Sequence, residues 1–183
     1  MAIRTYQGIT PNIAPTAYID DSAVVIGDVS IGEESSVWPM VVVRGDVNSI
    51  SIGHHTNIQD ASVLHVTHDH ELTPGGFALK IGNWVTVGHR VTLHGCTIGD
   101  SCLIGMSATI MDAAVIHDNV VVGAGSLVTP GKQLESGYLY VGSPIKKARK
   151  LTDQELASLN YSAEHYSRSK YKHLESNSAQ TQL

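Results

Sequence analysis

Aliphatic residues recur every six positions along most of this chain. They form four sets with an internal spacing of six: Ile13, Ile19, Val25, Ile31, Val37 and Val43; Ile52, Ile58 and Leu64; Ile81, Val87 and Leu93; Ile98, Ile104, Ile110, Ile116, Val122 and Val128. Six is a multiple of the two-residue period of a strand but not of the 3.6-residue helical period, so each unit predicts a short strand. Strands joined by corners at a fixed spacing predict an all-β solenoid, whose stacked coils bury a continuous aliphatic column.

Three irregularities interrupt the repeat. Val43 and Ile52 are nine residues apart, which indicates three inserted residues. Leu64 and Ile81 are seventeen apart, which indicates eleven inserted residues, nominally 70–80, with Pro-Gly-Gly at 74–76. The step from Leu93 is only five residues. Because long loops without a role are uncommon in compact domains, we expect the eleven-residue insertion to have a function.

The repeat stops after Val128, and a different pattern follows. Residues 137–144 predict a closing strand and turn, and Thr152 with Glu155 has the spacing of a capping box at the start of a helix. Apolar residues then recur at helical spacing: Leu156, Leu159, Ala163 and Tyr166. We therefore predict a lead-in over 1–12, a β-helix domain over 13–150, a helix over 151–174 packed on its side, and a disordered polar tail over 175–183.

Composition narrows the function classes. Hydrophobic residues make up 42% of the chain but aromatic residues only 5%, so the core should be aliphatic. The net charge is -5 with no basic cluster, which argues against nucleic acid. No apolar stretch has the length of a signal peptide or a membrane span. Two cysteines are too few for a disulfide scaffold, so we expect reduced, packed thiols and a cytoplasmic protein.

Three histidines stand out once the repeat is folded into coils. If three six-residue units make one coil, residues eighteen apart stack, and Leu64 and Leu93 are 29 apart, or 18 without the eleven inserted residues. His65 and His94 should then lie one above the other, on strands about 4.8 Å apart. Two imidazoles at that spacing can share a metal ion, and zinc, iron and cobalt are all compatible with histidine ligands.

His89 belongs to the repeat unit before His94, so it should lie around a corner from the stacked pair. It could still reach the ion bound by an adjacent subunit. Three-fold packing of triangular coils would place each His89 against the pair of another chain. The positions therefore predict a homotrimer with metal sites between subunits. A surface or packing role is the simpler interpretation of any one histidine alone, but the stacked pair together with His89 favours shared metal ligation.

The residues around these histidines resemble the signature of a known family. Arg44-Gly45-Asp46, Asn57-Ile58-Gln59-Asp60, Leu64-His65-Val66 and Gly88-His89 with His94-Gly95 are similar to the γ-class carbonic anhydrases, in particular to their bacterial YrdA-type members. The six-residue repeat resembles the left-handed parallel β-helices of hexapeptide-repeat proteins. The resemblance implies that fold and hand, zinc ligands at His65, His94 and a neighbour's His89, and reversible hydration of CO2 to bicarbonate by a metal-bound hydroxide.

The same resemblance implies roles for the neighbouring polar residues. Gln59 would hydrogen-bond the metal-bound solvent and Asn57 would line the site. Arg44, Asp46 and Asp60 would form a charged network at the subunit interface, where buried charges must be paired.

This chain also departs from the family pattern. Val47 and His68 stand where the well-studied γ enzyme has glutamates. His68 is the candidate proton shuttle in their place, with His70 and Glu71 as further candidates. The loss of the glutamates leaves CO2 hydration open to question. Two other functions therefore stay open: acyl transfer or thioester hydrolysis on coenzyme A derivatives, and a non-catalytic metal-binding trimer.

Overall fold

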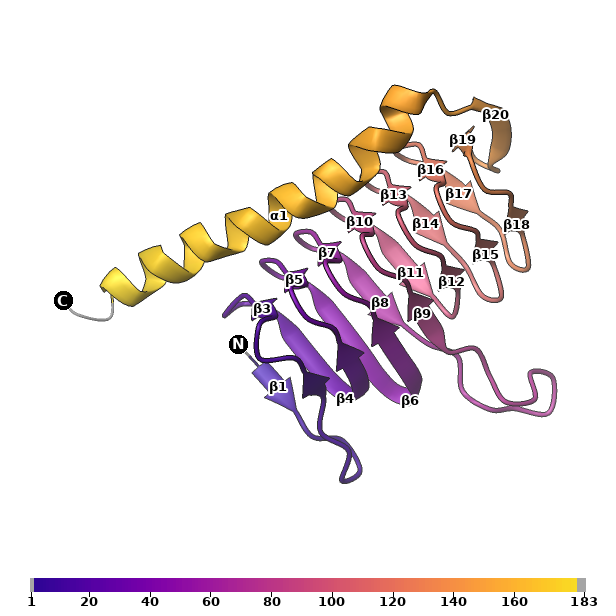
Figure 1. Cartoon of the computed structure of the whole chain (residues 1–183). Helices are drawn as coiled ribbons and strands as arrows, with labels where there is room; N and C mark the ends of the chain where they lie inside the picture. Colours follow the sequence, from indigo (N-terminus) through magenta and orange to yellow (C-terminus); the bar gives the residue numbers. More distant parts are fainter. Residues whose placement is uncertain (1, 181–183) are drawn as a thin grey trace.

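The chain folds as a parallel β-helix with one long α-helix running along its side (Figure 1). The computed structural model describes residues 2–180. Short strands pair in parallel with the strands of the coils before and after, and the only antiparallel pair of strands among the described residues is β19 with β20. The fold class that the six-residue repeat predicts is confirmed.

The strands form three faces. The helix face consists of β3 (Tyr18–Ile19), β5 (Ser36–Val37), β7 (Asn57–Ile58), β10 (Thr86–Val87), β13 (Leu103–Ile104), β16 (Val121–Val122), β19 (Tyr138–Val141) and β20 (Lys146–Lys150). The histidine face consists of β1 (Ala2–Arg4), the first halves of β4 (Val24–Ile31) and β6 (Val42–Ile52), β8 (Val63–His65), β11 (Thr92–His94), β14 (Thr109–Ile110) and β17 (Leu127–Val128). The third face consists of β2 (Asn12–Ile13), the second halves of β4 and β6, β9 (Leu79–Ile81), β12 (Thr97–Ile98), β15 (Val115–Ile116) and β18 (Gln133–Leu134).

The aliphatic columns fill the interior as the repeat predicts. Ile58, Leu64, Val87 and Leu93 are fully buried, and the small residues between them, such as Ser62, are buried beside them. The side chains at these positions point inward because successive residues of a strand face opposite sides.

Both predicted insertions lie next to the histidine face. In the pairing of β4 with β6, the single residue Asp28 stands opposite the four residues 46–49, so three extra residues bulge out. The longer insertion forms a loop over 66–78, between β8 and β9, that projects from the solenoid (Figure 1). Its base is held by a bridge between Thr67 and Phe77.

The C-terminal part follows the prediction in outline and departs from it in extent. The closing strand is β19, but β20, which pairs with it, was not predicted. The N-terminal lead-in also contains a strand, β1, which pairs with β4. The capping box forms: the Glu155 amide donates to Thr152 Oγ1 at 3.2 Å, and the Thr152 amide donates to Glu155 Oε2 at 2.9 Å.

The helix α1 spans Asp153–Gln180, beyond the predicted end at residue 174. The prediction of a disordered tail is therefore wrong for 175–180, and residues 181–183 lie outside the described part of the chain. The predicted apolar stripe accounts for the first half of the helix, where Leu159 and Ala163 are buried. No helix within residues 2–180 is long and apolar enough to cross a membrane.

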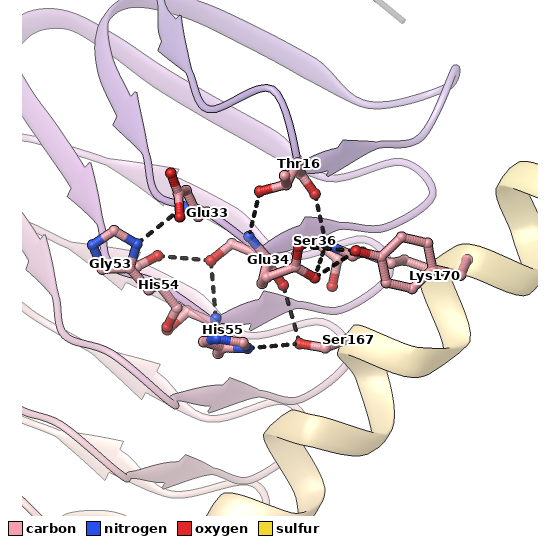
Figure 2. A network of polar contacts seen from close by, with 12 residues as sticks. Thr16, Glu33, Glu34, Ser36, Gly53, His54, His55, Ser167 and Lys170 are labelled. Atoms are coloured by element: carbon pink, nitrogen blue, oxygen red, sulfur yellow. Dashed lines mark hydrogen bonds and ion pairs between the residues drawn. The ribbon is translucent and has the colours of Figure 1, made fainter.

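Polar side chains dock the second half of α1, where the predicted apolar stripe does not continue. Lys170 is fully buried, and its Nζ lies 2.7 Å from Glu34 Oε2 and donates to the Thr16 carbonyl at 2.5 Å (Figure 2). Ser167 donates to the Glu34 carbonyl at 3.1 Å and contacts His55. A buried ammonium must be paired in this way because its desolvation is costly.

We expect Lys170→Ala to lower the free energy of unfolding by about 2 to 3 kcal/mol, because it leaves Glu34 and the Thr16 carbonyl without this partner. This expected loss of stability is at the low end for buried ion pairs, because the Glu34 side chain is 24% exposed and water can replace Lys170 as its partner. Urea denaturation measures the change, with the exposed Lys172→Ala as the matched control on the same helix. Equal losses in the two variants would contradict this account of docking.

Both cysteines are buried in the solenoid, in agreement with the predicted packing role. Burial raises the pKa of the Cys96 and Cys102 thiols to about 12, so both stay protonated and unreactive near neutral pH. We expect no labelling by a thiol-specific disulfide reagent at pH 8 in the folded protein and two labels per chain in denaturant. Rapid labelling of the folded protein would contradict this burial.

Candidate metal centre

His65 and His94 stack on the histidine face as the repeat count predicts. They end β8 and β11, and they are partners in the parallel ladder of these strands. Their ring centroids are 5.1 Å apart, and His65 Nδ1 lies 3.1 Å from His94 Nε2. Both side chains are partly exposed, so the pair lies at the surface of the solenoid.

A carboxylate holds the other nitrogen of each ring. His65 Nε2 lies 3.0 Å from Asp46 Oδ1, and His94 Nδ1 lies 2.5 Å from Asp112 Oδ1. A carboxylate can only accept, so each of these ring nitrogens donates. In neutral rings the remaining two nitrogens, His65 Nδ1 and His94 Nε2, are both acceptors. Two such lone pairs at 3.1 Å repel each other, and either a proton shared as a hydrogen bond or a bound metal ion relieves this repulsion.

The electrostatics of the site favour a neutral His65 ring. Burial holds the pKa of His65 below its ordinary value, and the hydrogen bond to Asp46 opposes this shift only in part. Hydrogen bonds from His65 and Arg44 hold the pKa of Asp46 low in spite of its burial, so this carboxylate is ionised. A neutral imidazole is the form that binds metals.

The geometry also fits a metal ion. Two ligand nitrogens on a tetrahedral ion with bonds of about 2.0–2.1 Å lie about 3.3 Å apart, close to the separation found here. His65 and His94 therefore fit two positions of such an ion. Within residues 2–180, however, no group of three or more His, Cys, Asp and Glu side chains is arranged to hold an ion by itself.

Sequence reasoning missed Asp112 and Thr67, which both contact this pair. In the parallel ladder Leu93 pairs with Ile110, so Met111 is the equivalent of His94 one coil further on and Asp112 lies one residue beyond it. The five-residue step after Leu93 shortens this coil to seventeen residues, so the repeat count leads to Met111 and does not find Asp112. Thr67 Oγ1 donates to Asp112 Oδ2 at 2.9 Å, from the start of the loop after β8.

His89 lies on the other side of a corner, as predicted. It follows β10 on the helix face, and the next residue, Arg90, turns the corner with a φ of +58°. Its Nδ1 lies 2.7 Å from Asp60 Oδ2 and donates to it, which leaves Nε2 with a free lone pair. All three candidate ligand histidines thus donate one ring nitrogen to a carboxylate, an arrangement typical of metal ligands.

The charged residues that were expected to form one network separate into two groups within the chain. Arg44 pairs with Asp46 on the histidine face, and Asp46 also accepts from His65. Asp60 pairs instead with His89 at the corner.

Gln59 and Asn57 lie on the side of His89. Gln59 Nε2 donates to Asn57 Oδ1 at 3.1 Å, and Asn57 Nδ2 donates to Thr86 Oγ1 at 3.1 Å. Gln59 and His89 line one cleft of about 340 Å³, which Met106 and Tyr166 also border. Both amides are buried, so the chain places an oriented amide beside His89.

His68 lies in the 66–78 loop, near the carboxylate of Asp46. It lines a cleft of about 440 Å³ together with Asp46, Val47 and Tyr6. Its ring meets that of His70 edge to face, with centroids 5.6 Å apart. Of the candidate proton shuttles, His68 therefore shares a cleft with a residue of the metal centre.

Comparisons with known proteins show the family of this chain. The family model "Bacterial transferase hexapeptide (six repeats)" matches residues 95–130. "Protein YrdA" of Escherichia coli is 52% identical over 173 residues, which cover 94% of each chain. "Gamma carbonic anhydrase 1, mitochondrial" of Arabidopsis thaliana is 43% identical over 157 residues, which cover 86% of this chain and 57% of that protein.

A solved structure shows the same fold over nearly its whole length. The hexapeptide transferase family protein of Anaplasma phagocytophilum has a TM-score of 0.85 and 40% identity, covering 93% of this chain and 97% of that one. The chain therefore belongs to the hexapeptide-repeat family of the γ-class carbonic anhydrases and their bacterial YrdA-type members.

Proposed function

We propose that this protein is a γ-carbonic-anhydrase-like metalloenzyme that hydrates CO2 reversibly at a three-histidine site between subunits. The observation that carries the proposal is the pair of acceptor nitrogens on His65 and His94, which face each other at 3.1 Å while carboxylates hold their other nitrogens. Zinc is the first candidate, with iron and cobalt as alternatives.

The third ligand is the His89 of a neighbouring subunit. One chain supplies only two ligand nitrogens, whereas catalytic zinc sites usually have three protein ligands. His89 has a free Nε2 but lies around the corner from the pair. A cyclic trimer brings each His89 to another chain and makes three equivalent sites.

Exposed apolar side chains support an interface at this face. Val63 is 43% exposed on β8, and Met111, which follows β14 one coil beyond His94, is 39% exposed. Met40 and Met106, on the corner that leads to this face, are 69% and 53% exposed. Apolar side chains gathered around polar groups are typical of a surface that a partner covers.

In the assembled site, a metal ion, Gln59 and His68 would have separate roles in CO2 hydration. A bound metal ion would lower the pKa of water to about 7 and so supply hydroxide near neutral pH. Gln59, held by Asn57, presents an amide that can hydrogen-bond CO2 or bicarbonate beside His89. His68, in the cleft beside Asp46, would carry a proton from the site to solvent.

Stopped-flow CO2 hydration tests the proposal. The protein is loaded with zinc and, separately, with iron under anaerobic conditions, and His94→Ala serves as the control. We expect metal-dependent hydration that the variant lacks, and a lower rate in His68→Ala than in the parent. One bound metal per chain with no rate above the control would contradict the assigned reaction.

Acyl transfer is the second candidate, because the matching family model and the similar Anaplasma protein both carry transferase names. Assays with acetyl coenzyme A and small amine or hydroxyl acceptors separate the two functions. Acyl transfer that persists in metal-free protein and in His94→Ala would favour this candidate over carbonic anhydrase activity.

A further inference from the structure

We propose that Asn48, Thr67 and Asp112 form a chain of positioning residues that orients His94 for metal binding. The proposal rests on the proposed function in one respect, which is that His94 is a metal ligand. It assigns a role to the two insertions that interrupt the repeat, because Asn48 lies in the shorter one and Thr67 in the longer one.

The first link joins Asp112 to His94. Asp112 Oδ1 accepts from His94 Nδ1 at 2.5 Å, which fixes the ring so that Nε2 faces His65. Gly95 allows this approach: a Cβ at that position would lie 2.5 Å from Asp112 Oδ1 and 2.7 Å from the Cβ of Phe77. The absence of a side chain at Gly95 therefore leaves room for the Asp112 carboxylate beside His94.

The second link joins Thr67 to Asp112. Thr67 Oγ1 donates to Asp112 Oδ2 at 2.9 Å, so the two oxygens of the carboxylate have different partners, His94 and Thr67. A carboxylate held at both oxygens cannot rotate without losing one of these bonds. Thr67 therefore fixes the direction from which Asp112 meets the imidazole.

The third link joins the two insertions. Asn48 Nδ2 lies 3.1 Å from the carbonyl oxygens of both Thr67 and Gly75, and donates to them from the bulge in β6. The Thr67 carbonyl also accepts from the Phe77 amide at 3.0 Å. A Cβ at Gly76 would lie 2.2 Å from the Thr67 oxygen and 2.8 Å from Asn48 Nδ2, so only glycine fits there. Asn48 thereby fastens both ends of the loop and holds Thr67 in place.

Metal affinity tests this chain of contacts without reference to catalysis. Competition between the protein and a chromophoric chelator for Co2+ gives the affinity, and the visible spectrum of bound Co2+ reports its ligand geometry. We expect Asp112→Ala to weaken binding about 10- to 100-fold, the range typical of groups that support metal ligands. We expect Thr67→Val to weaken it about threefold to tenfold and Asn48→Ala about threefold, each with an altered Co2+ spectrum.

The double variant Thr67→Val/Asp112→Ala separates positioning from general damage. Because Thr67 acts through Asp112, the double variant should bind Co2+ no more weakly than Asp112→Ala alone. Thr109→Val removes the same hydroxyl from the same face of the solenoid one coil away and should leave affinity and spectrum unchanged. The melting temperature of the metal-free Thr67→Val protein should match that of Thr109→Val.

Additive losses in the double variant, or Thr67→Val binding equal to the parent, would overturn the proposal. Tight Co2+ binding that these variants weaken as expected, in a protein without CO2 hydration, would contradict the proposed reaction and leave this chain of contacts standing. A parent protein that binds no Co2+ would overturn both.

Discussion

Replacing His94 by alanine is expected to lower zinc affinity by more than about 100-fold and to abolish metal-dependent CO2 hydration. The variant keeps His65 and the His89 of a neighbouring subunit, but two imidazoles cannot hold tightly an ion that needs three protein ligands. In the metal-free protein the two facing lone pairs do not stabilise the fold. The metal-free variant should therefore melt within a few degrees of the metal-free parent. Chelator competition and differential scanning calorimetry measure the two effects.

His117→Ala is the matched control for this prediction. His117 is an exposed histidine that follows β15 on the third face, away from the candidate ligands. Its replacement should leave zinc affinity unchanged. If His94→Ala bound zinc as tightly as His117→Ala, the stacked pair would not be the metal site.

Replacing His89 is expected to cost as much metal affinity as replacing His94, although the chain places His89 around a corner from the pair. The physical reason is that the neighbour's imidazole completes the ligand set, and Asp60 already holds its Nδ1 so that Nε2 is free to bind. Metal analysis after gel filtration and sedimentation velocity check the result together. The variant should remain an oligomer and carry no zinc.

A smaller effect would point to a different ligand set. If His89→Ala retained one zinc per chain with parental affinity, a carboxylate or solvent would supply the remaining ligands of the histidine pair. The assignment of His89 would then be wrong even if the protein were a trimer.

Much of the fold could be predicted because a solenoid converts sequence spacing directly into spatial stacking. The count of eighteen residues per coil placed His65 beside His94, and the structure pairs them in the same ladder position. Asp60 and His89 are also 29 residues apart, so the same count would have paired them. Asp112 was not found by this count, because the coil after His94 has seventeen residues and Met111 takes the equivalent position.

The contacts that could not be predicted involve the insertions and the C-terminal part. Asp46 reaches His65 from a bulge in which four residues face one, so no fixed register applies there. Asn48 contacts Thr67 at the start of the 66–78 loop. The six-residue period does not define the path of this loop. The docking of the second half of α1 was also missed, because buried Ser167 and Lys170 make it and the prediction of the helix used only apolar spacing.

Mixing of subunits tests the central claim, a metal site shared between chains, most directly. His89→Ala and His94→Ala proteins are unfolded, refolded together in equal amounts, and analysed for bound zinc and CO2 hydration. Neither variant alone should show a site, whereas random trimers should regain about one quarter of the parental sites, wherever an intact pair meets an intact neighbouring His89. If the mixture regained no zinc and no activity while forming mixed trimers, the shared site would be contradicted.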